Sequence, residues 1–172
     1  MILIAGVGYS HLTDLSFGPQ LVDALNQRDW PDYVQVEDLS YGPITVLQWF
    51  QDHPGRFDQA IFIGAMQRED TAPGELRTYR WNPDDLSEDV VHERVAEGVT
   101  GIVSLENLLM ILDYFAVLPG QPLVIEFEPV VAEWGLDLSP VGQRQLAEVI
   151  DVIDEQVLQA HAYAAEDFRT IR

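Results

Sequence analysis

An unbroken apolar run at residues 2–5, Ile-Leu-Ile-Ala, does most to limit what this chain can fold into. A short run of this kind, rich in β-branched residues and without polar alternation, is typical of a strand buried on both faces, as in parallel sheets. After the loop that begins at Gly6, the residues Phe17, Leu21 and Leu25 recur at helical spacing. The sequence therefore predicts a strand–loop–helix unit, and in open α/β sheets such loops are where ligands usually bind.

Further strands are predicted at residues 33–38, 60–66, 75–80 and 122–129, and further helices near residues 46–53, 104–115 and 139–160. Strands that alternate with helices indicate a three-layer α/β/α sandwich with a mostly parallel central sheet of about five strands. Residues 33–38 alternate apolar and polar side chains, which favours a place near the sheet edge, and residues 75–80 fit an edge strand or a hairpin. A chain of 172 residues fits a single domain.

Two segments are predicted to lie outside the regular elements. Residues 82–98 are rich in acidic and turn-forming residues, which indicates an irregular, mobile segment. Residues 161–172 are predicted to form a frayed C-terminal tail. The helix predicted near residues 104–115 starts with Ser104 as its cap, and its apolar face includes Leu105 and Phe115.

Loops that follow parallel strands meet at the carboxyl edge of the sheet, where we predict a cleft. The residues that come to this edge are Asp14, Asp38, Gly64, Thr100 and Gly101, with His11, Tyr41 and Gly42 as further candidates for binding a partner. Glycine weakens the interior of a strand. Its presence at position 64 therefore indicates a close backbone approach or a lost side chain.

The residues of this edge allow more than one chemistry. His11, Asp14 and Asp38 could meet and bind a metal ion, or they could be solvated and make turn hydrogen bonds. The neighbours Ser10 and His11 do not make a nucleophile and base, because adjacent loop residues rarely face each other usefully. The segment Gly6-Val7-Gly8 lacks the third glycine of a dinucleotide fingerprint.

Composition excludes several functions. The chain has no cysteine and no lysine, so thiolate nucleophiles, disulfides and Schiff-base chemistry are ruled out. A net charge of −20 repels nucleic acid and anionic membranes, and it favours neutral or basic partner surfaces. No apolar run approaches the ~20 residues that span a bilayer, and no basic leader precedes the first strand. We expect a cytoplasmic protein that binds neither nucleic acid nor membranes.

Short motifs occur along the chain in this order: Gly6-Val7-Gly8 with Leu12-Thr13-Asp14 and Gly18; Pro31-Asp32-Tyr33-Val34 leading to Asp38; Phe57-Asp58 through Ala65; Ala72-Pro73-Gly74; Ser104-Leu105 with Leu108-Leu109; and Leu138-Ser139-Pro140. In this order and spacing the chain resembles the hydrogenase maturation endopeptidases, which trim the carboxyl-terminal tail of the nickel-iron hydrogenase large subunit. The resemblance covers the chain except residues 80–98. It implies an α/β/α sandwich with a cleft that binds nickel through three side chains.

The resemblance also locates the three metal-ligand positions of the family. An acid after the first-loop aspartate, an aspartate ending the third strand and a histidine before the central helix fall here on Leu15, Gly64 and Gly101. None of these residues has a side-chain donor atom, and an apolar Leu15 disfavours a hydrated ion nearby. We therefore expect no bound nickel or other cofactor and no catalytic residue, and we expect Gly64 to leave room at the end of its strand.

Three functions fit these observations. The first is a non-proteolytic binding or assembly factor that docks a protein partner at the former metal cleft, the partner being a hydrogenase large subunit or a related metalloprotein subunit. The second is an active endopeptidase with relocated donors, and the third is a small-molecule binder in the vacated cleft. Four aromatic residues could anchor a partner or lie in the core: Trp30, Tyr41, Trp81 and Trp134.

Overall fold

The computed structural model describes residues 1–83, 87–100 and 102–170, with side chains through residue 160. The elements follow in the order β1 (Ile2–Val7), a 3-10 helix (Thr13–Ser16), α1 (Phe17–Leu25), β2 (Val34–Asp38), α2 (Pro43–Asp52), β3 (Gln59–Ala65), β4 (Leu76–Arg80), α3 (Glu88–Val99), α4 (Leu105–Tyr114), β5 (Leu123–Phe127) and α5 (Pro140–Thr170). None of the helices in the described ranges combines the length and the apolar character that a bilayer span needs.

The strands form one sheet in the order β2-β1-β3-β5-β4. All neighbours pair in parallel except β4, which lies antiparallel to β5 at one edge. The two segments with polar alternation thus take the two edges, as predicted, and residues 75–80 form an edge strand rather than a hairpin. The unbroken apolar runs form β1, β3 and β5 in the centre, where every residue of β1 is buried.

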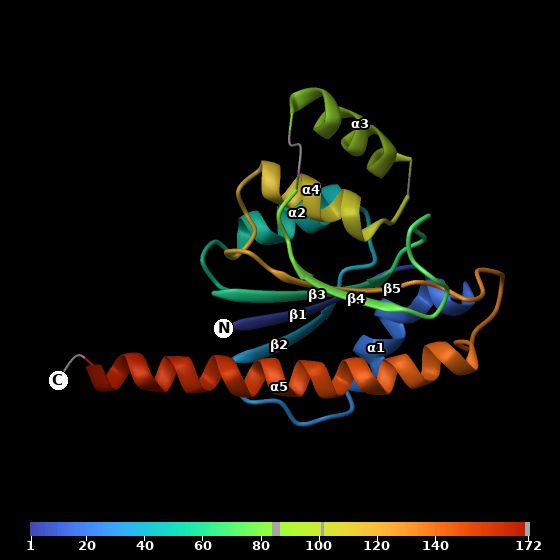
Figure 1. Ribbon diagram of the computed structural model, residues 1–172. Coiled ribbons are helices and arrows are strands. Elements are labelled where there is room, and N and C mark those ends of the chain that lie inside the picture. The colour runs from blue at the N-terminus through green and yellow to red at the C-terminus, as the bar shows by residue number, and fades with distance from the viewer. Residues whose placement is uncertain (84–86, 101, 171–172) are drawn as a thin grey trace.

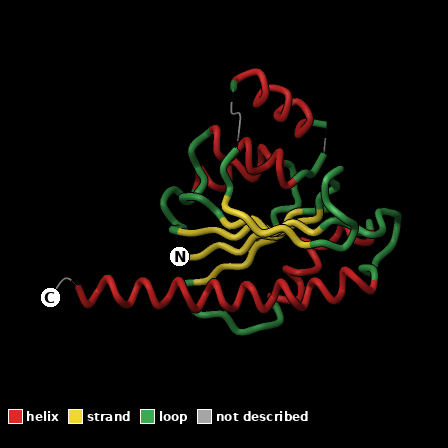
Figure 2. The backbone as a smooth tube through the Cα atoms, in the orientation of Figure 1, coloured by secondary structure: helices red, strands yellow, loops and turns green. Residues whose placement is uncertain are grey.

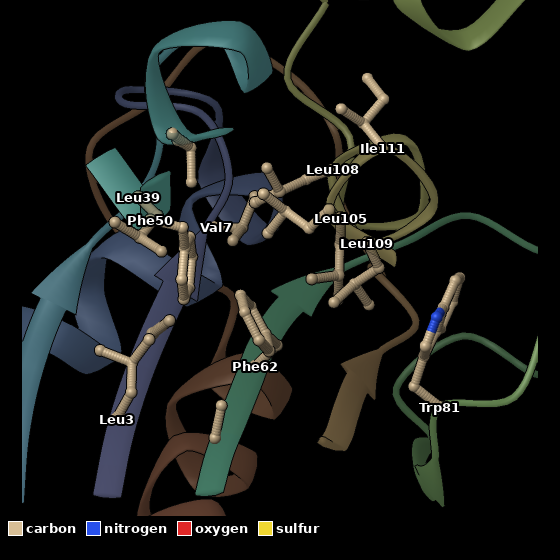
Figure 3. Close-up of a cluster of buried hydrophobic side chains, with 14 of the residues drawn as sticks. Leu3, Val7, Leu39, Phe50, Phe62, Trp81, Leu105, Leu108, Leu109 and Ile111 are labelled. Atoms are coloured by element: carbon tan, nitrogen blue, oxygen red, sulfur yellow. The ribbon is translucent and has the colours of Figure 1, made fainter. Parts of the chain in front are cut away.

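Helices cover both faces of the sheet, which gives the predicted three-layer sandwich (Figures 1 and 2). One face carries a core made with α2 and α4, in which Phe62 packs among Leu105, Leu108 and Leu109 (Figure 3). The opposite face carries a core made with α1 and α5, in which Phe17 stacks on Phe127. Alternate residues of each central strand feed the two cores, as the period of a strand requires.

Glycines bring the first helix against the sheet. A Cβ atom built on Gly6 would collide with the backbone carbonyl of Gly18, and one built on Gly18 would collide with the carbonyl of Val7. Side chains at these positions would therefore push α1 away from β1. The glycines of the opening loop serve helix–strand packing, and they place the β1–α1 loop at the carboxyl edge of the sheet.

The structure corrects three details. Residues 88–98, predicted to be irregular, belong to α3, because Val91 is buried and Val90 and Val95 pack against the core that contains α4. Phe115, predicted on the apolar face of α4, lies past the end of that helix and is 45% exposed. Helix α5 continues beyond residue 160 to Thr170 and extends past the sheet (Figure 1). Residues 84–86 of the acidic segment lie outside the described residues.

Candidate functional site

The predicted residues gather at the carboxyl edge of the parallel strands. Gly6 pairs with Asp38 at the end of β2, and Val7 pairs with Gly64 near the end of β3. The β1–α1 loop and the loop before α4 join this edge, because the Tyr9 hydroxyl accepts a hydrogen bond from the Val103 backbone N–H at 3.2 Å. Gly101 lies outside the described residues.

Asp14 is a structural residue at this edge rather than an open ligand. Its side chain is fully buried. One carboxylate oxygen accepts the N–H groups of Val130 and Val131 at 2.9 and 3.1 Å, and the other accepts the N–H of Ser139 at 2.8 Å. These bonds join the β1–α1 loop to the β5–α5 loop and to the start of α5, so the carboxylate is already occupied by backbone donors.

The β2–α2 loop carries Asp38 and Tyr41. The Asp38 carboxylate accepts the N–H of Ser40 at 2.9 Å, a turn hydrogen bond, and the side chain is exposed. Burial raises the pKa of the Tyr41 hydroxyl, and the nearby carboxylates of Glu37 and Asp38 raise it further. Gly42 precedes α2 as its N-cap residue. This loop is thus a polar turn in which a partly exposed Tyr41 lies near the acidic end of β2.

Gly64 is tightly enclosed, which corrects the expectation that its missing side chain leaves room. A Cβ atom at this position would lie 2.7 Å from the carbonyl oxygen of Val7 and 3.3 Å from Cδ2 of Leu105. Leu105 is the first residue of α4 and is itself buried. The helix side chain therefore fills the space beside the strand end, and Figure 3 shows Leu105 and Val7 on the same face of the sheet.

Thr100 follows the last residue of α3 as its C-cap residue. Its hydroxyl donates to the carbonyl of Glu97 at 2.6 Å. The Glu97 carboxylate accepts a hydrogen bond from the buried Asn107 amide at 2.6 Å and another from Arg94 at 2.8 Å. These two bonds, the one from Asn107 first, lower the pKa of Glu97. The bond from Asn107 ties α3 to α4, and the bond from Arg94 lies within α3. Both support the acidic segment as a helix.

The four candidate aromatic residues differ in exposure. Trp81 is buried, and its indole N–H donates to Asp113 at 2.8 Å. Trp30 is half-buried and donates to the Leu25 carbonyl. Tyr41 is 39% exposed and Trp134 is 81% exposed. Trp81 and Trp30 are therefore parts of the packing, and only the other two remain as open aromatic side chains of this set.

An ion pair next to Gly64, with a buried carboxylate and a partly exposed arginine, was not predicted. Glu126 of β5 pairs with Gly64 in register, and its side chain is 2% exposed. It accepts two hydrogen bonds from Arg68, both 2.8 Å long, and one from the Tyr79 hydroxyl at 2.5 Å. The hydrogen bonding of Arg68 to Glu126 is the main cause that raises the pKa of Arg68. The pKa of Tyr79 is raised first by burial and then by Glu126. The sequence signal that could have indicated this pair is Glu126, a charged residue inside the apolar run of residues 122–129.

The ion pair borders a cavity of about 340 Å³ between β4 and α4, lined in part by Tyr79, Trp81 and Met110. A larger cavity of about 430 Å³ lies at the opposite, amino-terminal edge of the parallel strands, between Phe57 and Phe115. Cavity volume therefore does not mark the edge that the sequence singles out.

The described residues do not fit the nickel ion that the family resemblance implies. Leu15 and Gly64 offer no donor atom, and Leu105 fills the space at Gly64. Among the side chains that the structure describes, in residues 1–83, 87–100 and 102–160, no three histidine or carboxylate groups gather as a metal ion would require. Of the alternative donors, Asp14 is already held by backbone N–H groups.

The sheet order and the two helical layers define a single-sheet α/β/α protein whose loops meet at the carboxyl edge of the parallel strands. The hydrogenase 2 maturation protease of Escherichia coli K12 is 28% identical over 160 residues, which cover 92% of this chain and 89% of that protein. The crystal structure of a hydrogenase 2 maturation peptidase from Thaumarchaeota archaeon SCGC_AB-539-E09 is 26% identical, with a TM-score of 0.63, over 91% of this chain and 97% of that one. Over nearly its whole length the chain is thus similar to hydrogenase maturation proteases.

The structure of the hydrogenase maturating endopeptidase HybD from E. coli shares the fold, with a TM-score of 0.67 at 23% identity over 92% of this chain and 93% of that chain. No family model matches the sequence.

Proposed function

We propose that this chain is a non-proteolytic member of its family that binds a protein partner at the carboxyl edge of its sheet. The observation that carries the proposal is the packing at Gly64, where Leu105 and the Val7 carbonyl occupy the space beside the strand end. The chain matches a maturation protease over nearly its full length, while a position to which the resemblance assigns a metal ligand is closed by packing. Binding without hydrolysis is what such a scaffold can still perform.

The state of the alternative donors argues against a relocated metal site. Asp14 is buried and holds three backbone N–H groups, so a metal ion would have to displace all of them. Asp38 holds the turn at Ser40, and His11 stacks on Trp134. The small-molecule alternative is disfavoured by the same packing, because the space at Gly64 is filled.

The surface of this edge supports a protein partner. Exposed apolar side chains lie on its loops and at the end of α3: Tyr41, Val99, Ile102, Val130, Trp134 and Leu136. Exposed apolar groups that gather on one side of a molecule commonly mark interaction sites. The names of the relatives point to hydrogenase maturation. We therefore propose a hydrogenase large subunit, or a related metalloprotein subunit, as the partner.

A binding and cleavage experiment tests the proposal. The purified chain is mixed with a nickel-loaded hydrogenase large-subunit precursor from the same organism. Complex formation is followed by size-exclusion chromatography, and the mass of the precursor is followed by mass spectrometry. We expect a complex with no loss of mass, and elemental analysis of the chain before and after nickel equilibration is expected to find no stoichiometric metal. Cleavage that stops in the Asp38→Ala variant would overturn the proposal.

A further inference from the structure

The β5–α5 loop presents a tryptophan to solvent. Trp134 is 81% exposed and Leu136 is 69% exposed. One face of the indole lies near the His11 ring, with the ring centroids 6.1 Å apart and the planes 18° from parallel. The loop runs along the side of the molecule between β5 and α5 (Figure 1). Large apolar side chains in such a position lose hydrophobic free energy unless a partner covers them.

Hydrogen bonds to the β1–α1 loop hold this exposed segment in place. The Thr13 hydroxyl donates to the Val131 carbonyl at 2.8 Å and accepts the Glu133 N–H at 3.1 Å. The backbone of Gly135 donates to the His11 carbonyl and accepts from the Thr13 N–H, at 3.0 and 3.1 Å. Asp14 holds the two ends of the β5–α5 loop, because its carboxylate accepts the N–H groups of Val130 and Val131 at one end and of Ser139 at the other. Trp134 therefore projects from a braced loop rather than from a free one.

The bracing has a conformational cost. His11 and Thr13 have positive φ angles of 67° and 42°. Such angles are unfavourable for residues with a Cβ atom, and β-branched threonine is among the least suited to them. Strain that is retained to hold a fixed loop is consistent with a binding role, because a preorganised tryptophan loses little entropy when a partner covers it.

The charges around the loop define the partner. Two exposed acidic residues, Glu133 and Asp137, flank Trp134 and Leu136. The chain as a whole carries a net charge of −20. We propose that Trp134 and Leu136 anchor a cationic protein segment that carries a central apolar side chain. The proposal rests on the proposed function, since it names the chemistry of the partner segment bound at the same edge.

A peptide experiment tests this anchor without the natural partner. The probe is a fluorescein-labelled peptide of arginine and serine with one central leucine, and its binding to the full chain is followed by fluorescence anisotropy. Two control peptides replace the leucine by serine or every arginine by glutamate. The protein variants are Trp134→Ala and, as a matched loss of an exposed apolar side chain elsewhere, Leu158→Ala on α5, where Leu158 is 68% exposed.

We expect the arginine–leucine peptide to bind the unaltered chain and the Leu158→Ala variant equally. Binding should weaken at least about tenfold for Trp134→Ala, as for a central aromatic anchor. It should also weaken for the leucine-free peptide and with the Glu133→Gln/Asp137→Asn pair. The anchor is refuted if the unaltered chain does not bind the peptide, or if Trp134→Ala binds it equally well. Cleavage of a large subunit, in contrast, refutes the proposed function and leaves the anchor standing.

Discussion

An aspartate introduced at position 64, where the resemblance implies a metal ligand, should destabilise this chain rather than create a metal site. The first carbon of the new side chain would lie 2.7 Å from the Val7 carbonyl oxygen, an atom of the central strand that cannot move aside. Overpacking of this kind costs about 1–3 kcal/mol. Burying the polar group without a partner adds about 1–3 kcal/mol. We therefore expect Gly64→Asp to lower the free energy of unfolding by about 2–6 kcal/mol.

Urea unfolding followed by circular dichroism measures this loss, and two further variants separate its causes. Gly64→Ala should show the overpacking part alone. Combining it with Leu105→Ala should cost less than the sum of the single changes, because the truncation removes the contact at 3.3 Å but not the one with Val7. Nickel binding by Gly64→Asp is expected to be absent by calorimetry. A variant within about 1 kcal/mol of the original chain, or one that binds nickel stoichiometrically, would refute the argument from packing.

Three further predictions concern the buried polar groups. Asp14→Asn should lower the free energy of unfolding by about 2–4 kcal/mol, because an amide nitrogen replaces one of the oxygens that accept backbone N–H groups; a loss below about 1 kcal/mol in urea unfolding would contradict it. Arg68→Met should cost about 3–5 kcal/mol, because the Glu126 carboxylate stays buried without its cation, whereas Arg77→Met, which breaks an exposed pair, should cost at most about 1 kcal/mol. Because the pKa of Tyr79 is raised by burial and by Glu126, the folded state holds the phenol proton more tightly than the unfolded state. This contribution to stability is complete below about pH 10 and is lost as the pH rises further, so Tyr79→Phe should flatten the alkaline fall of the urea midpoint; an unchanged slope would count against the burial of this hydroxyl.

The fold was predictable because its main signals are local. Unbroken apolar runs gave the central strands, and alternation gave the edge strands, since the number of buried faces of a strand determines its pattern. Helix α3 was missed for the same reason. Its acidic residues dominate the composition of residues 82–98, while the valines that dock it, Val91 and Val95 among them, are few. The hydrogen bond from Asn107 to Glu97 completes the docking and has no sequence signature.

The positions of the candidate residues in the fold were predictable, but their contacts were not. The carboxyl edge follows from the order of strands, so Asp14, Asp38 and Gly64 were placed there correctly. What each does depends on neighbours from distant segments. The donors that occupy Asp14 come from the β5–α5 loop, and the side chain that fills the space at Gly64 comes from α4. Pairings of this kind are set by the packed fold, and no local pattern reports them.

The bonds of Asp14 also have a consequence in time. They join residues that lie 116 to 125 positions apart in the chain. Contacts between such distant segments form slowly, and during synthesis the early elements emerge long before their partners. The Asp14 carboxylate therefore stays hydrated until β5 and the start of α5 have been synthesised and can supply its hydrogen-bond donors. Because the same bonds brace the loop that carries Trp134, a partner that docks there would recognise only chains that have folded as far as α5.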